Sequence, residues 1–234
     1  MAVSVSAMGS RPSIGARRRS PLRAALFRPL FAAMQHASRI MEAMLEVSLT
    51  GKLLVADPRL ADRNFERSVV LVLAHGADGA LGLVLDRPSE TEIERPLPGW
   101  APLATPPAVV FAGGPVEPQA VICVAQMASK DESEEWRDRG GWAPVSEHFG
   151  TLDLDLSPSE VGNALSRLRI FAGYAGWGPG QLEAEIEVGG WWVLDAAPED
   201  PFASHPSELW KSVLRRQGGK LALMAAYPAD PRLN

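Results

Sequence analysis

The sequence predicts a single α+β domain with a mixed, curved β-sheet and flanking helices. Strand-length apolar segments outnumber helical segments, and hairpin signals precede the clearest helix signals along the chain. Apolar residues make up 46% of the chain and charged residues 22%, so there is enough apolar material for a large core. This composition also lacks the low hydrophobicity and high charge that are typical of disorder.

Five segments in the first half of the domain are expected to be strands. Each is a short apolar or β-branched run bounded by turn-forming residues, which is typical of buried strands. The Asp78-Gly79 pair predicts a hairpin between the second and third segments, and Gly82 in the third indicates a bulge or a close approach of the backbone. The five segments are residues 52–56, 67–74, 80–85, 108–112 and 120–125.

The stretches between these strands are expected to lie at the surface. Residues 88–107 are rich in proline and acidic side chains, and they predict an excursion with one helical turn near Ile93. Residues 129–141 are charged and predict a mobile, solvated loop. Cys123 is the single cysteine, and its apolar neighbours favour a small buried side chain over a reactive thiol.

The second half of the domain contains the clearest helix signals. Ser157, Pro158 and Glu160 form a capping box with a first-turn proline, which predicts a helix from about residue 158 to 167. Pro206 in a first turn and Gly218 as a left-handed stop predict a helix over residues 205–217. Residues 181–188 are ambiguous, because they alternate like a strand but are flanked by glycines and a proline as a helix is. The remaining expected strands are residues 169–172, 191–196 and 221–226.

The glycine-rich segment 168–183 is the strongest indication of a functional site. Glycine is needed where φ is positive or where the backbone approaches another group closely. A tightly prescribed loop is therefore predicted by Gly173, Gly176, Gly178 and Gly180. The rings of Tyr174 and Trp177 flank this loop. A tryptophan between two glycines is expected to be partly exposed, and an exposed tryptophan often anchors recognition.

Four motifs together resemble the AlgH/YqgE family in its actinobacterial form. They are Asn-Phe-Glu-Arg-Ser at 64–68, Gly-Ala-Leu-Gly-Leu-Val-Leu-Asp-Arg-Pro at 79–88, Gly-Gly-Pro at 113–115 and the glycine-rich segment 168–183. The resemblance covers residues 45–234 and favours a helix over residues 181–188. It implies an uncharacterised bacterial family whose members are often labelled transcriptional regulators, and which usually has asparagine at the position of Asp86.

Residues 1–44 precede the resemblance and are expected to be a basic, disordered N-terminal extension. Their composition is typical of a transit peptide or a nucleic-acid-binding arm, or of sequence upstream of a true start at Met34, Met41 or Met44. Residues 1–48 carry a net charge of +5, whereas the remainder carries 16 basic and 26 acidic residues, a net charge of −10. Because DNA binding depends on neutralising phosphates, direct binding by the body is disfavoured, and any binding is expected to be non-specific and due to the arm.

The function that these observations favour is a cytoplasmic, non-catalytic binding or regulatory role, with a protein or a small molecule as partner. No run approaches about 18 apolar residues, so no membrane association is expected. No metal or cofactor is expected, because the histidines are scattered and the chain has one cysteine. The alternative is a hydrolase-like, small-molecule enzyme in which Ser68 or Glu183 reacts.

The candidate binding residues lie at strand ends and in the glycine-rich segment. The backbone at Gly180, together with Arg67 or Arg87, is a candidate anion site. Alternatively, Arg87 pairs with Glu183 or Asp86, and the glycines only let elements cross closely. The full set is Arg67, Asp86, Arg87, Gly113, Gly114, Tyr174, Gly176, Trp177, Gly180 and Glu183.

Overall fold

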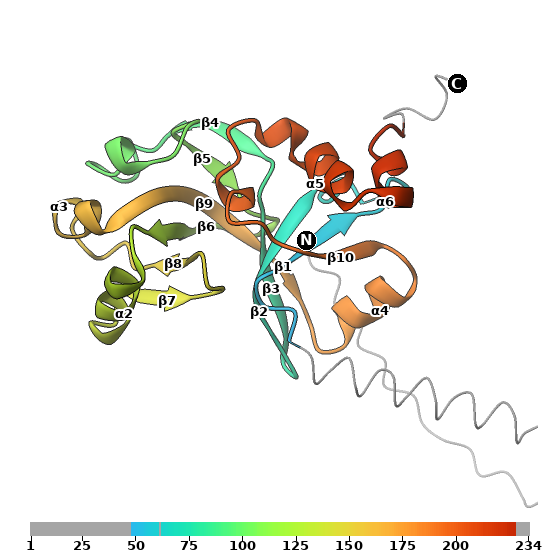
Figure 1. Cartoon of the computed structure of the whole chain (residues 1–234), viewed down its shortest axis with the longest axis horizontal. Helices are drawn as coiled ribbons and strands as arrows, with labels where there is room; N and C mark the ends of the chain where they lie inside the picture. Colours follow the sequence, from blue (N-terminus) through green and yellow to red (C-terminus); the bar gives the residue numbers. More distant parts are fainter. Residues whose placement is uncertain (1–47, 61, 228–234) are drawn as a thin grey trace, which may run out of the picture. The chain divides into compact units, whose positions relative to one another are not determined.

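The computed structural model describes residues 48–60 and 62–227 (Figure 1). The extension expected over residues 1–44 lies outside these described residues. Within them, ten strands form one curled, mixed sheet, and the helices lie against it. The predicted α+β domain with a mixed, curved sheet is therefore confirmed.

Strand β9 (Leu165–Trp177) connects the two parts of the sheet. One edge of β9 pairs antiparallel with β6 (Val116–Met127), while the other pairs in parallel with β5 (Val109–Ala112) and then antiparallel with β3 (Gly79–Val84). The remaining strands are β2 (Val69–Gly76), β1 (Lys52–Ala56) and β10 (Trp191–Asp195) beyond β3, β8 (Gly150–Leu152) and β7 (Trp142–Pro144) beyond β6, and β4 (Pro88–Glu92) beside β5.

The hairpin expected at Asp78-Gly79 joins β2 to β3 and is confirmed. The register shifts in β2 between Val72 and Ala74, opposite Gly82 in β3. A Cβ atom on Gly82 would lie 2.7 Å from Val70 Cγ1. Gly82 therefore permits a close approach, and the bulge lies in the partner strand.

Both faces of the sheet are covered at β1. Leu53 and Val55 belong to a buried cluster that includes side chains of α5 (Leu209–Gln217), whereas Leu54 belongs to a cluster with α4 (Gln181–Glu187). Because side chains alternate along a strand, α5 covers one face and α4 the other. The helix that the family resemblance favours over residues 181–188 is thus present as α4.

The helix that was expected over residues 158–167 is much shorter. It consists of α3 (Pro158–Val161) and the 3-10 turn η2 (Gly162–Ala164). The chain leaves the helix because Leu165 already pairs with Met127 of β6. Backbone pairing across the sheet therefore overrides the local helix signal, and β9 begins four residues before the expected strand.

Two further expectations were wrong in the opposite direction. The predicted loop at residues 129–141 contains α2 (Lys130–Asp138), which Ser129 caps by accepting a hydrogen bond from the Glu132 N–H and which buries Trp136. The predicted strand at residues 221–226 is α6 (Gly219–Met224). Its Leu221 and Met224, three residues apart on one helix face, pack against the core beside α5.

The predicted excursion over residues 88–107 contains β4, a turn and the 3-10 turn η1 (Ala101–Leu103). The turn begins at Ile93, whose carbonyl accepts a hydrogen bond from the Leu97 N–H, and the Ile93 side chain is buried. The helix expected over residues 205–217 begins as the 3-10 turn η4 (Pro206–Glu208), continues as α5, and stops at Gly218 with a φ of 70°. Across the described ranges, no helix is both long and apolar enough to cross a membrane.

Candidate functional site

The ten candidate residues lie in three parts of the fold. These are the turn before β2, the crossing of residues 113–114 with β9, and the end of β9 with the start of α4. Arg67, Asp86 and Arg87 surround the turn that precedes β2. The Arg67 guanidinium lies 4.9 Å from the Trp210 ring centroid and donates a hydrogen bond to the Tyr227 carbonyl oxygen at 2.7 Å. These contacts tie the turn to the C-terminal helices.

Among the described residues, Arg87 forms no ion pair with Asp86, which was one of the two partners expected for it. Arg87 donates to the carbonyl oxygens of Arg63 and Glu66, at 3.4 and 3.5 Å, so it braces the turn. Asp86 Oδ1 is buried without a hydrogen-bond partner among the described residues. Burial raises the pKa of Asp86 to about 7, which makes its carboxyl group a site of pH-dependent stability.

Gly113 and Gly114 allow the chain to cross β9 closely. A Cβ on Gly113 would overlap the Gly173 carbonyl oxygen, and one on Gly114 would overlap the Tyr174 carbonyl group. Gly113 and Tyr174 therefore belong to a crossing of two backbones. This agrees with the expectation that these glycines let elements pass closely.

Most of the glycine-rich segment is strand and not loop, because β9 extends to Trp177. Gly173 and Gly180 have positive φ values of 71° and 72°, as expected. Gly176 does not, and a Cβ there would make only an ordinary contact of 3.5 Å with the Tyr174 ring. The predicted special conformation at Gly176 is therefore wrong.

Trp177 is a core residue and not an exposed anchor. It is 6% exposed and packs against Phe65 and Trp191, with ring-centroid distances of 6.0 and 6.1 Å. Its Nε1–H donates to Glu185 Oε2 at 2.9 Å, and the Trp191 Nε1–H donates to the same oxygen at 2.8 Å. The Glu185 carboxylate thus holds α4 against two buried indoles, and the expectation of exposure at Trp177 is wrong.

Glu183 is buried and bound to His75. The distance between His75 Nε2 and Glu183 Oε1 is 2.7 Å, and the Leu49 N–H donates to His75 Nδ1 at 3.3 Å. Because Nδ1 accepts a hydrogen bond, the ring proton is on Nε2, which donates a hydrogen bond to the Glu183 carboxylate. Glu183 therefore does not pair with Arg87. It lies in the first turn of α4, next to the candidate anion site at Gly180, and a carboxylate there disfavours the binding of an anion.

The nucleophile of the enzyme alternative is also inaccessible. Ser68 is fully buried, and its Oγ–H donates to the Phe65 carbonyl oxygen at 2.8 Å. Cys123 is buried as predicted, and burial raises the pKa of its thiol. In the part of the chain that the structure describes, no three His, Cys, Asp or Glu side chains are grouped so that they could hold a metal ion.

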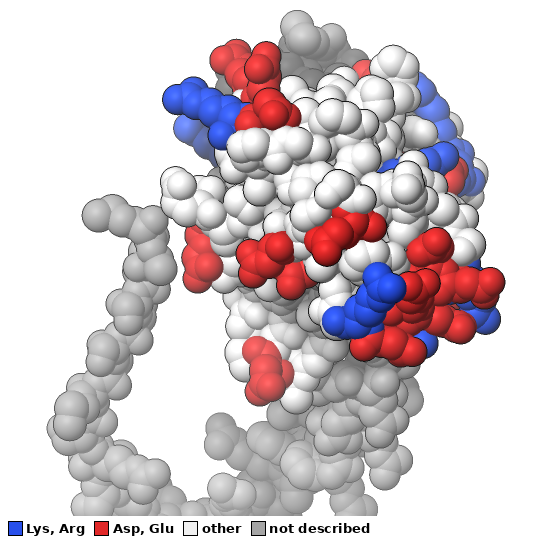
Figure 2. All heavy atoms as spheres, turned by 90° about the vertical axis from the view of Figure 1, so that its left-hand side faces the viewer, with Lys and Arg blue, Asp and Glu red and all other residues white. Residues whose placement is uncertain are grey.

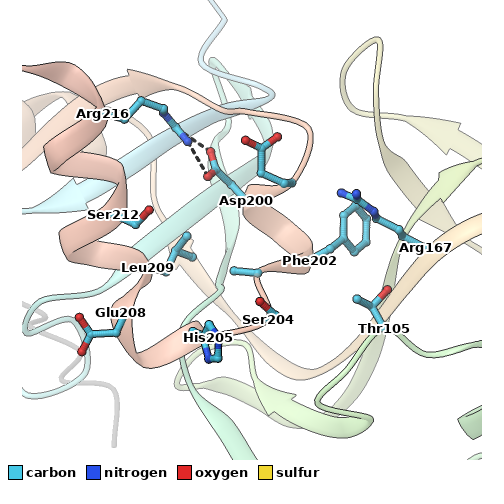
Figure 3. A pocket seen from close by; sticks show the side chains of 12 residues that line it. Thr105, Arg167, Asp200, Phe202, Ser204, His205, Glu208, Leu209, Ser212 and Arg216 are labelled. Carbon is cyan, nitrogen blue, oxygen red and sulfur yellow. Dashed lines mark hydrogen bonds and ion pairs between the residues drawn. The ribbon is translucent and has the colours of Figure 1, made fainter.

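A pocket of about 570 Å³ lies elsewhere, between α5, β9 and the 3-10 turns η3 (Asp200–Phe202) and η4 (Figure 3). Sequence reasoning missed this pocket because its walls come from segments far apart in the chain. Ser212 and Leu209 of α5 lie on one side, with Arg167 and Thr105 opposite, as Figure 3 shows. The residues between these walls include Asp200, Phe202, Ser204, His205 and Glu208, with Arg216 at one end.

The α5 wall is fixed by an ion pair between the buried Asp200 and the partly exposed Arg216. Asp200 accepts two hydrogen bonds from the Arg216 guanidinium, both at 2.8 Å, and one from the Ala197 N–H at 2.6 Å. Hydrogen bonding to Asp200 raises the pKa of Arg216. A bidentate contact of this kind restricts both partners in orientation, so it holds α5 against η3.

The opposite side of the pocket rests on Arg169, which is 1% exposed. Its guanidinium donates to the carbonyl oxygens of Pro106, Pro201 and Ala203, at 3.0–3.1 Å, and lies 4.3 Å from the Phe111 ring centroid. Burial lowers the pKa of Arg169 to about 10, so the side chain remains charged at neutral pH. Within residues 48–60 and 62–227, no carboxylate forms an ion pair with it.

The sequence of this chain is similar to those of known bacterial proteins. The sequence profile described as AlgH-like matches residues 53–222. A UPF0301 protein of Streptomyces coelicolor is 50% identical over 195 residues, covering 83% of this chain and all of that protein. A UPF0301 protein of Mycobacterium tuberculosis is 42% identical over 180 residues, covering 77% of this chain and 88% of that protein.

Two solved structures are similar to the described fold. The crystal structure of a Corynebacterium diphtheriae protein has a TM-score of 0.71 and 32% identity, covering 76% of this chain and 91% of that one. The solution structure of the AlgH protein from Pseudomonas aeruginosa has a TM-score of 0.57 and 30% identity, covering 78% of this chain and 95% of that one.

Proposed function

The chain belongs to the AlgH-like family, and we propose that it is a cytoplasmic, non-catalytic binding protein with a regulatory role. Its ligand site is the pocket between α5 and β9. The observation that carries this proposal is a hollow of about 570 Å³ with polar side chains left unused by the fold. Pockets of roughly 300–1,000 Å³ are typical of small-molecule sites.

The walls of the pocket favour binding because they are already ordered. Asp200 and Arg216 fix one side, and Arg169 holds the backbone of the other. A preformed site loses little conformational entropy when a ligand enters. The fold therefore supplies a rigid recess for a small molecule or for a side chain of a partner protein.

The alternative, a hydrolase-like enzyme, has weaker support. Ser68 and Glu183 are buried and engaged in hydrogen bonds, away from the pocket. The pocket itself contains Ser204, Ser212 and His205, but no hydrogen bond joins the histidine to either serine among the residues described. A serine nucleophile needs an adjacent base within hydrogen-bond reach.

The regulatory part of the proposal does not require contact with DNA. The chain after residue 48 carries a net charge of −10. Among the charged side chains on the face that includes α2 and α3, acidic ones predominate over basic ones (Figure 2), and α2 has five acidic residues against two basic ones. Such a surface repels phosphates, so we propose that any effect on transcription passes through a bound ligand or partner protein.

The test uses the full-length chain and a pocket-filling variant, Ser212→Trp, with Lys220→Trp on the exposed surface of α6 as control. A mixture of small neutral, anionic and cationic aromatic compounds is screened by ligand-observed NMR. We expect wild type and Lys220→Trp to bind at least one compound that Ser212→Trp does not bind. Equal binding by all three proteins, or by none, would contradict the pocket as ligand site.

A second measurement addresses the enzyme alternative. Hydrolysis of 4-nitrophenyl acetate is followed with wild type and with Ser204→Ala and Ser212→Ala. The proposed function predicts no hydrolysis above the rate with denatured protein. Turnover that disappears in one serine variant would instead establish the hydrolase.

A further inference from the structure

We propose that the ligand of this pocket carries an oxyanion group, a carboxylate or a phosphate, and that Arg167 binds it. This inference rests on the proposed function, since it specifies the chemistry of the same pocket.

Most of the charges are neutralised locally. Arg216 is paired with the buried Asp200, and Glu199 also lies close enough to raise the pKa of Arg216. Glu208 is paired with Lys211, with 3.2 Å between Nζ and Oε1. Two of the three acidic side chains of the pocket, Asp200 and Glu208, are thus paired with cations, and the third, Glu199, lies near Arg216.

Arg167 differs from Arg216, the other arginine of the pocket lining. Its side chain is exposed at the wall opposite α5, and it has no hydrogen-bond or ion-pair partner in the described part of the chain. A guanidinium presents several N–H donors in a planar fork that matches carboxylate and phosphate oxygens. An anionic ligand would complete this wall without displacing an existing interaction.

A second positive charge lies behind the same wall. Arg169 is two residues further along β9, so its side chain leaves the strand on the same face as that of Arg167. Its guanidinium is bound to the carbonyl oxygens of Pro201 and Ala203, which form part of the pocket lining or adjoin it. A buried charge without a counter-ion produces a field that water screens poorly, so this side of the pocket favours an anion.

Hydroxyl groups add neutral donors around the same site. Thr105 Oγ1 accepts a hydrogen bond from the Leu168 N–H at 3.2 Å, which leaves its hydroxyl hydrogen for a ligand oxygen. Phe202 and Leu209 line the pocket between the polar groups. The expected ligand is therefore a small molecule with one oxyanion group and a compact apolar part.

The test uses four probes that share one ring and differ in charge: benzoate, phenyl phosphate, benzyl alcohol and benzylamine. Each is titrated into ¹⁵N-labelled full-length protein, and amide shifts of the pocket residues give the affinity. We expect the anions to bind at least about tenfold more tightly than the alcohol or the amine, the ratio that one charge-assisted contact of about 1.4 kcal/mol provides. Binding of benzoate, phenyl phosphate or both supports the inference and distinguishes a carboxylate from a phosphate ligand.

The matched variants are Arg167→Gln and Arg95→Gln, because both arginines are exposed and Arg95 lies outside the pocket. We expect Arg167→Gln to reduce anion affinity by about tenfold and to leave the alcohol unaffected, while Arg95→Gln changes neither. Equal losses in the two variants, or anion binding that Arg167→Gln does not alter, would overturn the inference.

The two proposals fail in different ways. Binding of the alcohol or the amine as tightly as benzoate, abolished by Ser212→Trp, would refute the anion preference and leave the pocket function standing. No shift of pocket residues with any probe would refute both.

Discussion

Replacement of Arg169 by methionine is expected to lower the free energy of unfolding by about 3 kcal/mol. Methionine keeps most of the length and the apolar contact of the arginine stem but removes every donor. The change therefore removes the three hydrogen bonds to Pro106, Pro201 and Ala203 together with the guanidinium contact with the Phe111 ring.

The magnitude follows from opposing contributions. A buried acceptor that loses its partner costs about 1–3 kcal/mol, so three carbonyl oxygens set a range of roughly 3–9 kcal/mol. Loss of the cation–π contact with Phe111 adds about 1 kcal/mol. In return, the variant no longer buries a charge without a counter-ion, and this offsets several kcal/mol. Water that reaches the carbonyls near the pocket offsets more, which leaves a net loss near the lower limit.

Urea unfolding measures this loss, with Arg167→Met as the matched control on the same strand. Because Arg167 is exposed and has no partner in the described residues, its variant is expected to remain within about 0.5 kcal/mol of wild type. Arg169→Lys is expected to be destabilised as well, because one ammonium group does not reproduce the guanidinium fork. If Arg169→Met is as stable as wild type, the buried hydrogen bonds contribute nothing net and the argument is wrong.

Three other predictions concern different parts of the fold. Glu185→Ala should lower the free energy of unfolding in urea by about 2–4 kcal/mol, because two buried indole N–H groups lose their acceptor. The control Glu187→Ala, at an exposed position of α4, should lower it by less than about 0.5 kcal/mol. Similar losses in the two variants would contradict the role of Glu185. Gly114→Ala should lose more than about 3 kcal/mol of unfolding free energy or fail to fold, since its Cβ would overlap the Tyr174 backbone. Gly176→Ala should lose about 1 kcal/mol or less. Equal melting temperatures of the two variants would refute this prediction. Burial raises the pKa of Asp86 from 3.8 to about 7, so the folded state holds a proton that the unfolded state releases, and the stability that this proton gives is lost as the pH rises from about 4 to 7. Asp86→Asn should therefore be more stable than wild type at pH 8, by at most about 4 kcal/mol, and little different at pH 4. A difference in stability that is the same at both pH values would exclude Asp86 as the cause.

Local sequence was sufficient for features that depend on neighbouring residues. The hairpin at Asp78-Gly79 and the stop at Gly218 follow from backbone conformations that few other residues adopt. The strand at residues 52–56 follows from an apolar run that is buried on both faces. The close crossing at Gly113 and Gly114 was also anticipated, because a missing Cβ is informative wherever two backbones meet.

Short apolar or charged segments required tertiary context. Residues 221–226 have an apolar composition that suits either a strand or a helix face, and packing beside α5 selects the helix α6. Helix α2 lies in a charged segment whose clearest signals are the Ser129 cap and the single buried Trp136. Trp177 was expected to be exposed because it lies between two glycines. It is buried because it occupies an inward-facing position at the end of the long strand β9, which the local sequence does not indicate.

The pocket is the feature least accessible to sequence reasoning. The pocket brings together Thr105, Arg167, Asp200 and Arg216, because η3 packs against β9 and Arg216 of α5 binds Asp200 of η3. A charge that remains unpaired there, such as that of Arg167, cannot be told from an ordinary surface arginine until its neighbours are known. Composition and spacing limit the fold class, whereas a binding site depends on which side chains the fold brings within a few ångströms of one another.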